Sequence, residues 1–237
     1  MIGNGPTILN APTIYNTGAG GVYAGRGVYK GDFIYKFVTI GGKKYRAVLI
    51  GNIFWLDENL DYKDNNIGYN TSDSLTSPRC CYYNNQSQPP FSGYGLLYNY
   101  PATKYINQNI LTDGWRVANS NDFVNLCLFA GGVEDTPSGS MIKGFLNCGT
   151  SLKSTSNWVQ GNDYGNGTNE FGFNAFPSGR KFGGNFSGIG EHFNSWLIDT
   201  VDSENSCRTD IYYDAPNFAY YKTKNDRMAS IRICIDA

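Results

Sequence analysis

Residues 152–173 read LKSTSNWVQGNDYGNGTNEFGF, and this stretch decides how the chain is interpreted. Trp158 precedes a run of asparagine and glycine, and the aromatic residues Phe171 and Phe173 close the stretch. Asparagine and glycine tolerate the positive φ angles that tight turns require. We therefore expect residues 162–170 to form a turn that stabilises the fold, with the flanking aromatic side chains in the core.

The same turn offers oxygen ligands for a metal ion. Calcium is bound by roughly six to eight oxygen atoms, and Asp163, Asn166 and Glu170 are candidate ligands. Their spacing does not match that of an EF-hand loop. Calcium is thus the one cofactor that the sequence suggests, as the alternative to a purely structural turn.

Upstream of this stretch, the pattern predicts three strands. Residues 33–40 and 44–50 are rich in β-branched and aromatic residues, and Gly41-Gly42 between them is a hairpin signal. Residues 53–56 form a third apolar run, and the polar residues 61–90 are expected to be a loop. Residues 94–100 then resume as a strand or as a strand that leads into a helix.

The clearest helix signal follows at residues 119–130. Asn119 to Asp122 are capping residues, an apolar face begins at Phe123, and Gly131-Gly132 ends the pattern. Residues 141–152 are expected to form a short helix or strand. Short strands are expected further on, at residues 172–176, 195–199, 208–213, 218–222 and 230–236. Little helix and many short antiparallel strands predict an α+β domain, with Trp55, Trp115, Trp158 and Trp196 in its core.

The composition indicates a binding protein more than an enzyme. Charged residues make up 16% of the chain, below the roughly 25% that is usual, and the net charge is −1. A basic face for nucleic acid is therefore not expected, and no apolar run is long enough to insert into a membrane. The chain has 18 tyrosines and 29 glycines, a bias that is shared by antibody binding loops and by loop-rich β proteins.

Residues 1–32 differ from the rest, and we expect them to form an arm outside a domain at 33–237. The first 30 residues hold seven glycines and two prolines, too little apolar surface to fold alone. The arm is interpreted as an attachment or oligomerisation segment, and a floppy tail is the alternative. Its candidate anchors are Tyr15, Val22, Tyr23, Val28 and Tyr29.

The cysteines and the single histidine give no sign of catalysis or of a zinc site. None of the six cysteines forms a Cys-x-x-Cys pair, so buried free thiols are expected, with a Cys207–Cys234 disulfide as the alternative. His192 and Ser195 are not part of a recognisable triad motif. Asp57 and Glu58 are a weak candidate for a glycosidase carboxylate pair. We therefore expect no enzymatic activity.

Several segments, taken in order, carry a family resemblance. They are Trp55-Leu56-x-x-Asn59-Leu60, Tyr94-Gly95-x-Leu97-Tyr98, Gly114-Trp115-Arg116-Val117, residues 152–173, and Ser230-Ile231-Arg232-Ile233-Cys234. Over residues 33 to 237 the chain resembles the Fibrobacter succinogenes major paralogous domain. The resemblance implies a C-type-lectin-like fold with twisted antiparallel strands, one or two helices and long ligand-binding loops. Fold alone does not settle function.

Two departures from the family shape the functional hypothesis. Arg116-Val117-Ala118 stands where the family commonly has His-Leu-Pro, which we interpret as a structural substitution. Family members are typically exported lipoproteins, whereas this sequence shows no export signal and carries the arm. This combination favours a bacteriophage head-fibre, tail-fibre or head-decoration protein, made in the host cytoplasm and displayed on the virion surface. A bacterial cell-surface binding protein, or a ligand-free structural capsid decoration, is the alternative.

The segment from Asp199 to Arg227 is the candidate binding surface, because in the lectin-like fold the ligand-facing residues usually lie there. Its polar residues include Asp202, Asn205 and Asn225. The predicted ligand-binding residues are Asp210, Tyr212, Tyr213, Asp214, Asn217, Tyr220, Tyr221 and Lys222. Tyrosine rings stack on sugars, and amides and carboxylates read hydroxyl groups. The alternative is an ordinary strand pair with alternate tyrosines packed inward.

These features together predict an adhesin that binds a host-surface glycan or protein. The arm is expected to contact capsid or tail proteins, and closed symmetry favours self-association as a dimer or trimer. Several copies would strengthen weak binding at each site.

Overall fold

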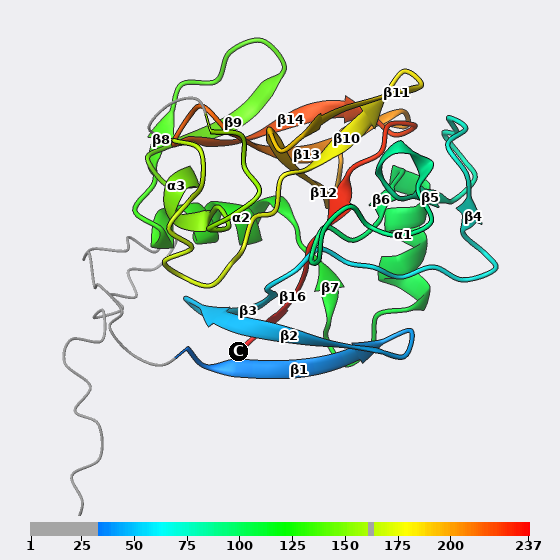
Figure 1. Cartoon of the computed structure of the whole chain (residues 1–237), viewed down its shortest axis with the longest axis horizontal. Helices are drawn as coiled ribbons and strands as arrows, with labels where there is room; N and C mark the ends of the chain where they lie inside the picture. Colours follow the sequence, from blue (N-terminus) through cyan, green and yellow to red (C-terminus); the bar gives the residue numbers. More distant parts are fainter. Residues whose placement is uncertain (1–32, 161–163) are drawn as a thin grey trace, which may run out of the picture. The chain divides into compact units, whose positions relative to one another are not determined.

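Two large β-sheets form the framework of the computed structural model, which describes residues 33–160 and 164–237. The five-stranded sheet has the order β1-β2-β3-β16-β7 and lies in the lower half of Figure 1. Its strands are β1 (Tyr35–Ile40), β2 (Lys43–Ile50), β3 (Ile53–Leu56), β16 (Ile233–Asp236) and β7 (Arg116–Val117). All of its neighbouring strands are antiparallel.

The six-stranded sheet has the order β15-β12-β13-β14-β9-β8 and carries most of the C-terminal half of the chain. Its strands are β15 (Ser230–Ile231), β12 (His192–Thr200), β13 (Asn205–Tyr212), β14 (Phe218–Lys224), β9 (Met141–Leu146) and β8 (Val133–Asp135). Only β12 and β15 run parallel. The hairpin of β10 (Ser178–Phe182) and β11 (Asn185–Ile189) lies against this sheet (Figure 1).

The first three strands confirm the sequence prediction. β1 and β2 pair up to Ile40 and Lys43, and the turn between them is Gly41-Gly42. Both glycines have positive φ angles, of 58° and 84°. A two-residue hairpin loop with positive φ at both positions matches the twist of the strands, and glycine adopts it without strain.

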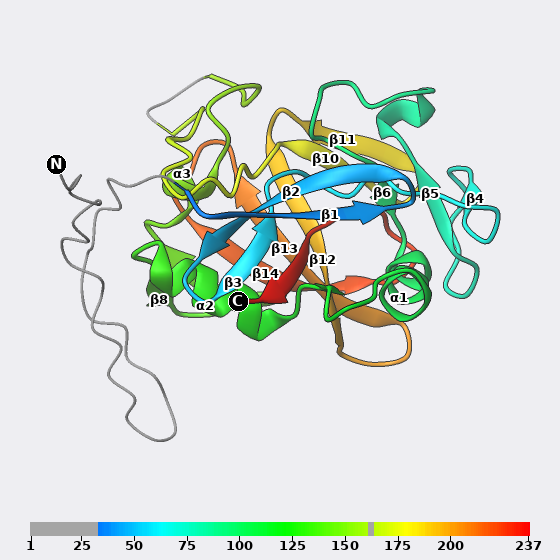
Figure 2. The same cartoon turned by 90° about the horizontal axis from the view of Figure 1, so that it is seen from below.

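Strands β2 and β3 are covered on both faces, which explains why β3 is apolar at every position. Val48 and Trp55 pack into one core cluster, together with residues of α2 (Ser120–Phe129) and of the six-stranded sheet. Ala47 and Leu56 pack into a second cluster, together with residues of α1 (Tyr100–Asn109). Because side chains alternate along a strand, neighbouring residues enter different clusters. Figure 2 shows the two helices on opposite sides of β3 and β16.

The helix predicted near residue 120 is confirmed, and a second long helix was not clearly predicted. Asn119 accepts from the backbone N–H of Asp122, and the Asp122 carboxylate accepts from the N–H of Asn119, which makes a complete capping box for α2. Helix α1 begins with the same kind of signal. The side chain of Asn99 accepts from the N–H of Ala102, and Pro101 lies in the first turn.

The remaining elements are short and lie mainly in the region predicted as loop. They are β4 (Gly68–Tyr69), β5 (Arg79–Cys81), the 3-10 helix η1 (Tyr83–Asn85), β6 (Leu97–Tyr98) and the four-residue helix α3 (Gly149–Leu152). Strands β4, β5 and β6 form a three-stranded sheet. Residues 61–90 therefore contain more order than their polar sequence predicts.

The prediction of an α+β domain was wrong, because the described residues contain far more strand than helix. About 40% of them lie in strands and 13% in helices, and the strands belong to several sheets. The two sheets and α2 share one apolar core, in which Phe123 of α2 contacts Trp55 of one sheet and Phe218 of the other. The four tryptophans are buried as expected, and Trp55 contacts Phe123 and Phe173 edge-on, with ring centroids 4.9 and 5.4 Å away. None of the helices in residues 33–160 and 164–237 is long and apolar enough to cross a membrane.

Candidate ligand-binding site

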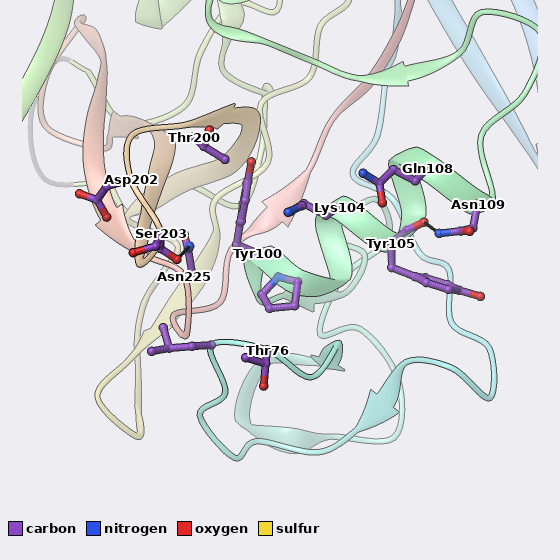
Figure 3. A pocket seen from close by; sticks show the side chains of 12 residues that line it. Thr76, Tyr100, Lys104, Tyr105, Gln108, Asn109, Thr200, Asp202, Ser203 and Asn225 are labelled. Atoms are coloured by element: carbon purple, nitrogen blue, oxygen red, sulfur yellow. Dashed lines mark hydrogen bonds between the residues drawn. The ribbon is translucent and has the colours of Figure 1, made fainter.

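A polar pocket of about 660 Å³ opens beside α1 (Figure 3). Four separate parts of the chain form it: one side of α1, the loop at Leu75 and Thr76, the end of β12 with the turn that follows, and Asn225 after β14. Its lining residues are Leu75, Thr76, Tyr100, Pro101, Lys104, Tyr105, Gln108, Asn109, Thr200, Asp202, Ser203 and Asn225. Amides and hydroxyl groups predominate, so the pocket suits a ligand with many hydrogen-bonding groups.

Tyr100 gives the pocket a rigid wall. Its backbone N–H donates to the carbonyl of Asn225 at 3.0 Å, and its hydroxyl donates to the carbonyl of Ile198. Its ring packs edge-on against Trp196 at 5.5 Å between centroids. Burial raises the pKa of Tyr100 to about 12, which keeps the hydroxyl protonated and donating. Helix α1 and strand β12 are thus joined at the pocket.

Asn225 lines the pocket and has one hydrogen-bond acceptor that is not satisfied. The residue is only 6% exposed, and its Nδ2 donates to the carbonyl of Ser203 at 3.3 Å. Its backbone N–H donates to the carbonyl of Glu204 at 2.8 Å. Its Oδ1 is buried and has no hydrogen-bond partner among the described residues. A buried polar atom without a partner destabilises the fold by about 1–3 kcal/mol, so a donor from a ligand or from water is expected here.

The pocket rim carries charges of both signs. Lys104 and Gln108 are exposed on α1, and Lys104 lies between Tyr100 and Gln108 in Figure 3. Asp202 accepts from Lys222 at 2.9 Å. Hydrogen bonds from Lys222, Asn205 and the Glu204 backbone hold the pKa of Asp202 well below its usual range, so this carboxylate stays ionised.

The described lining of the pocket does not contain the carboxyl pair of a glycosidase. A glycosidase needs two carboxyl groups that flank the scissile bond, one of them protonated. Asp202 is the one carboxylate in the described lining, and it is held in the ionised form. The lining therefore provides hydrogen-bond partners but not this acid–base pair.

The ligand-binding residues predicted from the sequence do not form one site. Tyr220 is 8% exposed and packs into the first core cluster, as does the partly buried Tyr213. Asn217 accepts from the backbone of Asn147, Lys222 pairs with Asp202 at the pocket rim, and Asp214 is exposed. Asp210, Tyr212 and Tyr221 lie on the opposite face of β13 and β14 from Tyr220. Side chains alternate between the two faces of a strand, so predicted ligand-binding residues that are close in the sequence point to opposite faces of the sheet.

Sequence reasoning missed most of the pocket but included two of its residues. Asp202 and Asn225 belong to the segment from Asp199 to Arg227 that was expected to face a ligand. The residues on α1 were missed because that helix was not clearly predicted. The Asn99 and Pro101 signal at its start was the clue that could have revealed it.

The candidate catalytic residues have structural partners. His192 contacts Asp210, with 2.8 Å between Nδ1 and Oδ1, while the fully buried Ser195 accepts from the backbone N–H of Arg232. Asp57 pairs with Arg46 in β2. Glu58 pairs with Lys43 at 2.9 Å, also in β2. These contacts tie strands and turns together, and they do not form a triad or a carboxylate pair.

The turn predicted at residues 162–170 is described from residue 164 on, and hydrogen bonds tie it to the end of α3. Its backbone N–H groups at positions 167–170 donate to the carbonyls of Ser154, Thr150, Lys153 and Ser151, so the turn satisfies the end of α3. Asn169 and Gly172 have positive φ angles. A Cβ on Gly167 would lie 2.5 Å from the carbonyl oxygens of Thr150 and Lys153, a distance that only glycine avoids.

The described residues do not form the calcium site that the sequence suggested. The Oδ1 of Asn166 accepts from the backbone N–H of Trp158 at 3.1 Å, and Glu170 is exposed. Asp163 lies outside the described residues. Within 33–160 and 164–237, no group of three or more His, Cys, Asp or Glu side chains is placed to hold a metal ion. Calcium binding therefore stays a prediction, without support from this geometry.

The cysteines are all free and buried, as expected, and Cys207 and Cys234 are not joined. Burial raises the pKa of Cys80 and Cys81 to about 12 and that of Cys207 to about 11. A thiolate is the reactive form, so these thiols are unreactive in the folded chain. The anchor residues of the arm, Tyr15, Val22, Tyr23, Val28 and Tyr29, lie outside the described residues, and their attachment role stays a prediction.

Comparison with known proteins places the chain in a family. The family model of the Fibrobacter succinogenes major domain matches residues 48–235. The chain belongs to this family, which confirms the resemblance drawn from its motifs. No curated protein and no solved structure matches the chain. The C-type-lectin-like fold that the resemblance implied therefore receives no support from solved structures.

Proposed function

We propose that this chain is a binding module that holds a neutral, hydroxyl-rich glycan in the pocket beside α1. The observation that carries the proposal is the buried and unpartnered Oδ1 of Asn225 in the lining of that pocket. A sugar hydroxyl donates to such an acceptor and also accepts from the amides at the rim.

The make-up of the pocket supports a sugar over an apolar ligand. The partly exposed Tyr105 presents aromatic surface, while Gln108 and Asn109 supply exposed amides to the lining. Sugar recognition combines an aromatic surface with amide and hydroxyl groups in this way. Hydrogen bonds fix the backbone of the site. Asn99 caps α1, and the backbone N–H of Tyr100, the first residue of α1, donates to the carbonyl of Asn225.

The setting of the protein is part of the proposal. We place the module on a surface that meets other cells, as a virion fibre or adhesin, with a bacterial cell-surface protein as the alternative. The chain belongs to the Fibrobacter succinogenes major domain family, and the surface role is what the resemblance to that family implies. In either setting, display of several copies would raise the apparent affinity of a weak pocket.

The experiment is a glycan array that is probed with the full chain, with and without a calcium chelator. Lys104→Ala removes an exposed donor at the pocket, and Lys44→Ala removes an exposed lysine of β2 as the matched control. We expect saturable binding to a small group of glycans, lost with Lys104→Ala and retained with Lys44→Ala.

Two results would contradict the proposal. One is a folded protein that binds no glycan on a broad array. The other is binding that Lys104→Ala leaves unchanged, since the ligand would then lie elsewhere. Loss of binding with the chelator alone would show that a metal ion participates and would return attention to Asp163, Asn166 and Glu170.

A further inference from the structure

Three arginines gather around Phe182, where the β10–β11 hairpin covers one face of the six-stranded sheet. Arg180 comes from β10, Arg208 from β13 and Arg227 from the turn before β15. Their guanidinium carbons lie 4.6, 5.1 and 4.4 Å from the centroid of one ring, that of Phe182. Guanidinium groups stack on aromatic rings, so Phe182 holds all three side chains in place.

Among the described residues, Asp210 is the one carboxylate that forms ion pairs with these arginines. Asp210 Oδ2 accepts from Arg180 at 3.1 Å and from Arg208 at 3.2 Å, while Asp210 Oδ1 contacts His192. Both oxygens of Asp210 are therefore occupied. Arg227 forms no ion pair or side-chain hydrogen bond with the described residues. Three guanidinium groups thus face one carboxylate.

Two of the arginines keep part of their hydrogen-bonding capacity unused. Arg208 makes its hydrogen bonds through Nη1 alone, to Asp210 and to the carbonyl of Thr209. Arg180 also uses only Nη1, to Asp210 and His192. The Nε atoms of both are buried and have no partner among the described residues. The Nη2 atom of each of these two arginines makes no hydrogen bond with the described residues and is not among the buried unpartnered atoms, so it is the donor open to a carboxylate or sulfate oxygen.

Burial makes this excess charge energetically important. Arg208 is only 5% exposed, and burial lowers its pKa below the usual value even though Asp210 acts in the opposite direction. A buried cation that is not fully paired weakens the fold, and an anion that completes the pairing removes this cost. The ion pair that Arg208 forms with the described residues is with Asp210, and the positive charge of Arg180 beside it lowers the pKa of Arg208 further.

We infer that Arg180, Arg208 and Arg227 form a binding site for the carboxylate or sulfate group of an acidic sugar. Tyr221, whose ring centroid is 5.8 Å from the Arg208 guanidinium, and Tyr212, on the same face of the sheet, flank the site with flat aromatic surface. This site shares no residue with the pocket beside α1. The inference therefore goes beyond the proposed neutral glycan and does not depend on it.

The experiment titrates the full chain with three small sugars that differ in charge: glucuronate, glucose 6-sulfate and glucose. Arg227→Ala is the main variant, because Arg227 is partly exposed and its one hydrogen bond among the described residues, from its backbone N–H to Lys224, is kept by alanine. Arg46→Ala is the matched control, since Arg46 also stacks on an aromatic ring, that of Tyr35 at 4.7 Å. Lys104→Ala tests whether the acidic group lies in the pocket instead. Thermal melting of each variant checks that it is folded.

We expect at least one acidic sugar to bind more tightly than glucose, with an affinity that falls as salt is raised. Arg227→Ala should weaken this binding roughly tenfold, as loss of a charged hydrogen-bonding partner does, while Arg46→Ala and Lys104→Ala should not. Preference for glucuronate or for glucose 6-sulfate will identify the acidic group. Equal binding of glucose, no binding of either acidic sugar, or an affinity that Arg227→Ala does not change would overturn the inference.

Discussion

The guanidinium of Arg232 donates through Nε to the side-chain oxygen of Asn59, a residue 173 positions earlier, at 2.8 Å. The same guanidinium donates to the carbonyls of Leu56 and Phe173 at 2.7 and 2.6 Å and to that of Asn174. Arg232 is fully buried and also stacks on the Phe173 ring. One side chain thus joins the end of β3, the residues before β16 and the turn that follows Trp158.

Replacing Arg232 should therefore destabilise the domain strongly. Arg232→Met would leave Asn59 and three carbonyl groups without their donor, which we expect to cost about 3–5 kcal/mol in the free energy of unfolding. Arg232→Lys keeps the charge, but a single amine cannot reach all four acceptors. Urea denaturation measures both. The exposed Arg46→Lys should change stability by less than about 0.5 kcal/mol, and an equally small effect at Arg232 would contradict its role.

Lys153 should make the stability of the folded domain depend on pH in the alkaline range. Its buried Nζ donates to the carbonyls of Tyr164, Tyr213 and Ala215, and burial lowers its pKa from 10.5 to about 8. Between pH 8 and 10.5 the unfolded chain therefore holds a proton that the folded chain has lost. Rising pH then stabilises the folded state through this residue.

Lys153→Met should remove this contribution and cost about 1.5–3 kcal/mol at neutral pH. Tyrosines and cysteines also titrate at alkaline pH, but they are common to both proteins. The gap in unfolding free energy between wild type and Lys153→Met should therefore widen from pH 8 to pH 10. A gap that is constant with pH would show that Lys153 keeps its ordinary pKa. Lys224→Met, at an exposed position of β14, is the control.

Asp210 should make the domain sensitive to acid. Burial alone would raise its pKa, but the hydrogen bond to His192 and the charges of Arg208 and Arg180 lower it below 3.8. Its stabilising effect is complete above about pH 4 and is lost as pH falls through the folded-state pKa, where the carboxylate is protonated. Asp210→Asn should lower stability at pH 7 and flatten the acid limb of the stability curve. A variant that keeps the wild-type acid limb would refute this assignment.

The cysteines should be unreactive until the chain unfolds. All six are buried, and for Cys80, Cys81 and Cys207 the raised pKa also suppresses the thiolate. A thiol reagent at pH 8 should label none of them in the native protein within minutes and all of them in denaturant. Rapid labelling of a native thiol, or fewer than six thiols after denaturation, would show an exposed cysteine or a disulfide.

The parts of the fold that the sequence predicted are those with local signals. The hairpin at Gly41-Gly42 and the capping box of Asn119 and Asp122 each lie within a few residues. Helix α1 follows a run of tyrosine and leucine that reads as strand, so its polar start at Asn99 was outweighed. The excess of strand over helix depends on how two sheets cover each other, which no single segment reveals.

The candidate site was harder to predict because its residues meet only in the folded chain. Thr76, Lys104 and Asn225 lie in three distant segments. Tyr220 and Tyr221 are neighbours, yet one packs in the core and the other lies on the outer face, because the register of β13 and β14 decides which residues face outward. The arginine group was not predicted for the same reason, because Arg180, Arg208 and Arg227 come from separate segments and meet at the ring of Phe182.

The most direct test of the proposed pocket is calorimetric titration of the full chain with the glycan that binds best on the array. Gln108→Ala removes an exposed amide of α1 at the pocket, and Asn125→Ala removes an exposed amide of α2 away from it. We predict that Gln108→Ala weakens binding roughly five- to tenfold, the value of one hydrogen bond, and that Asn125→Ala leaves it unchanged. Equal affinity of both variants and wild type would contradict the assignment of the ligand to this pocket.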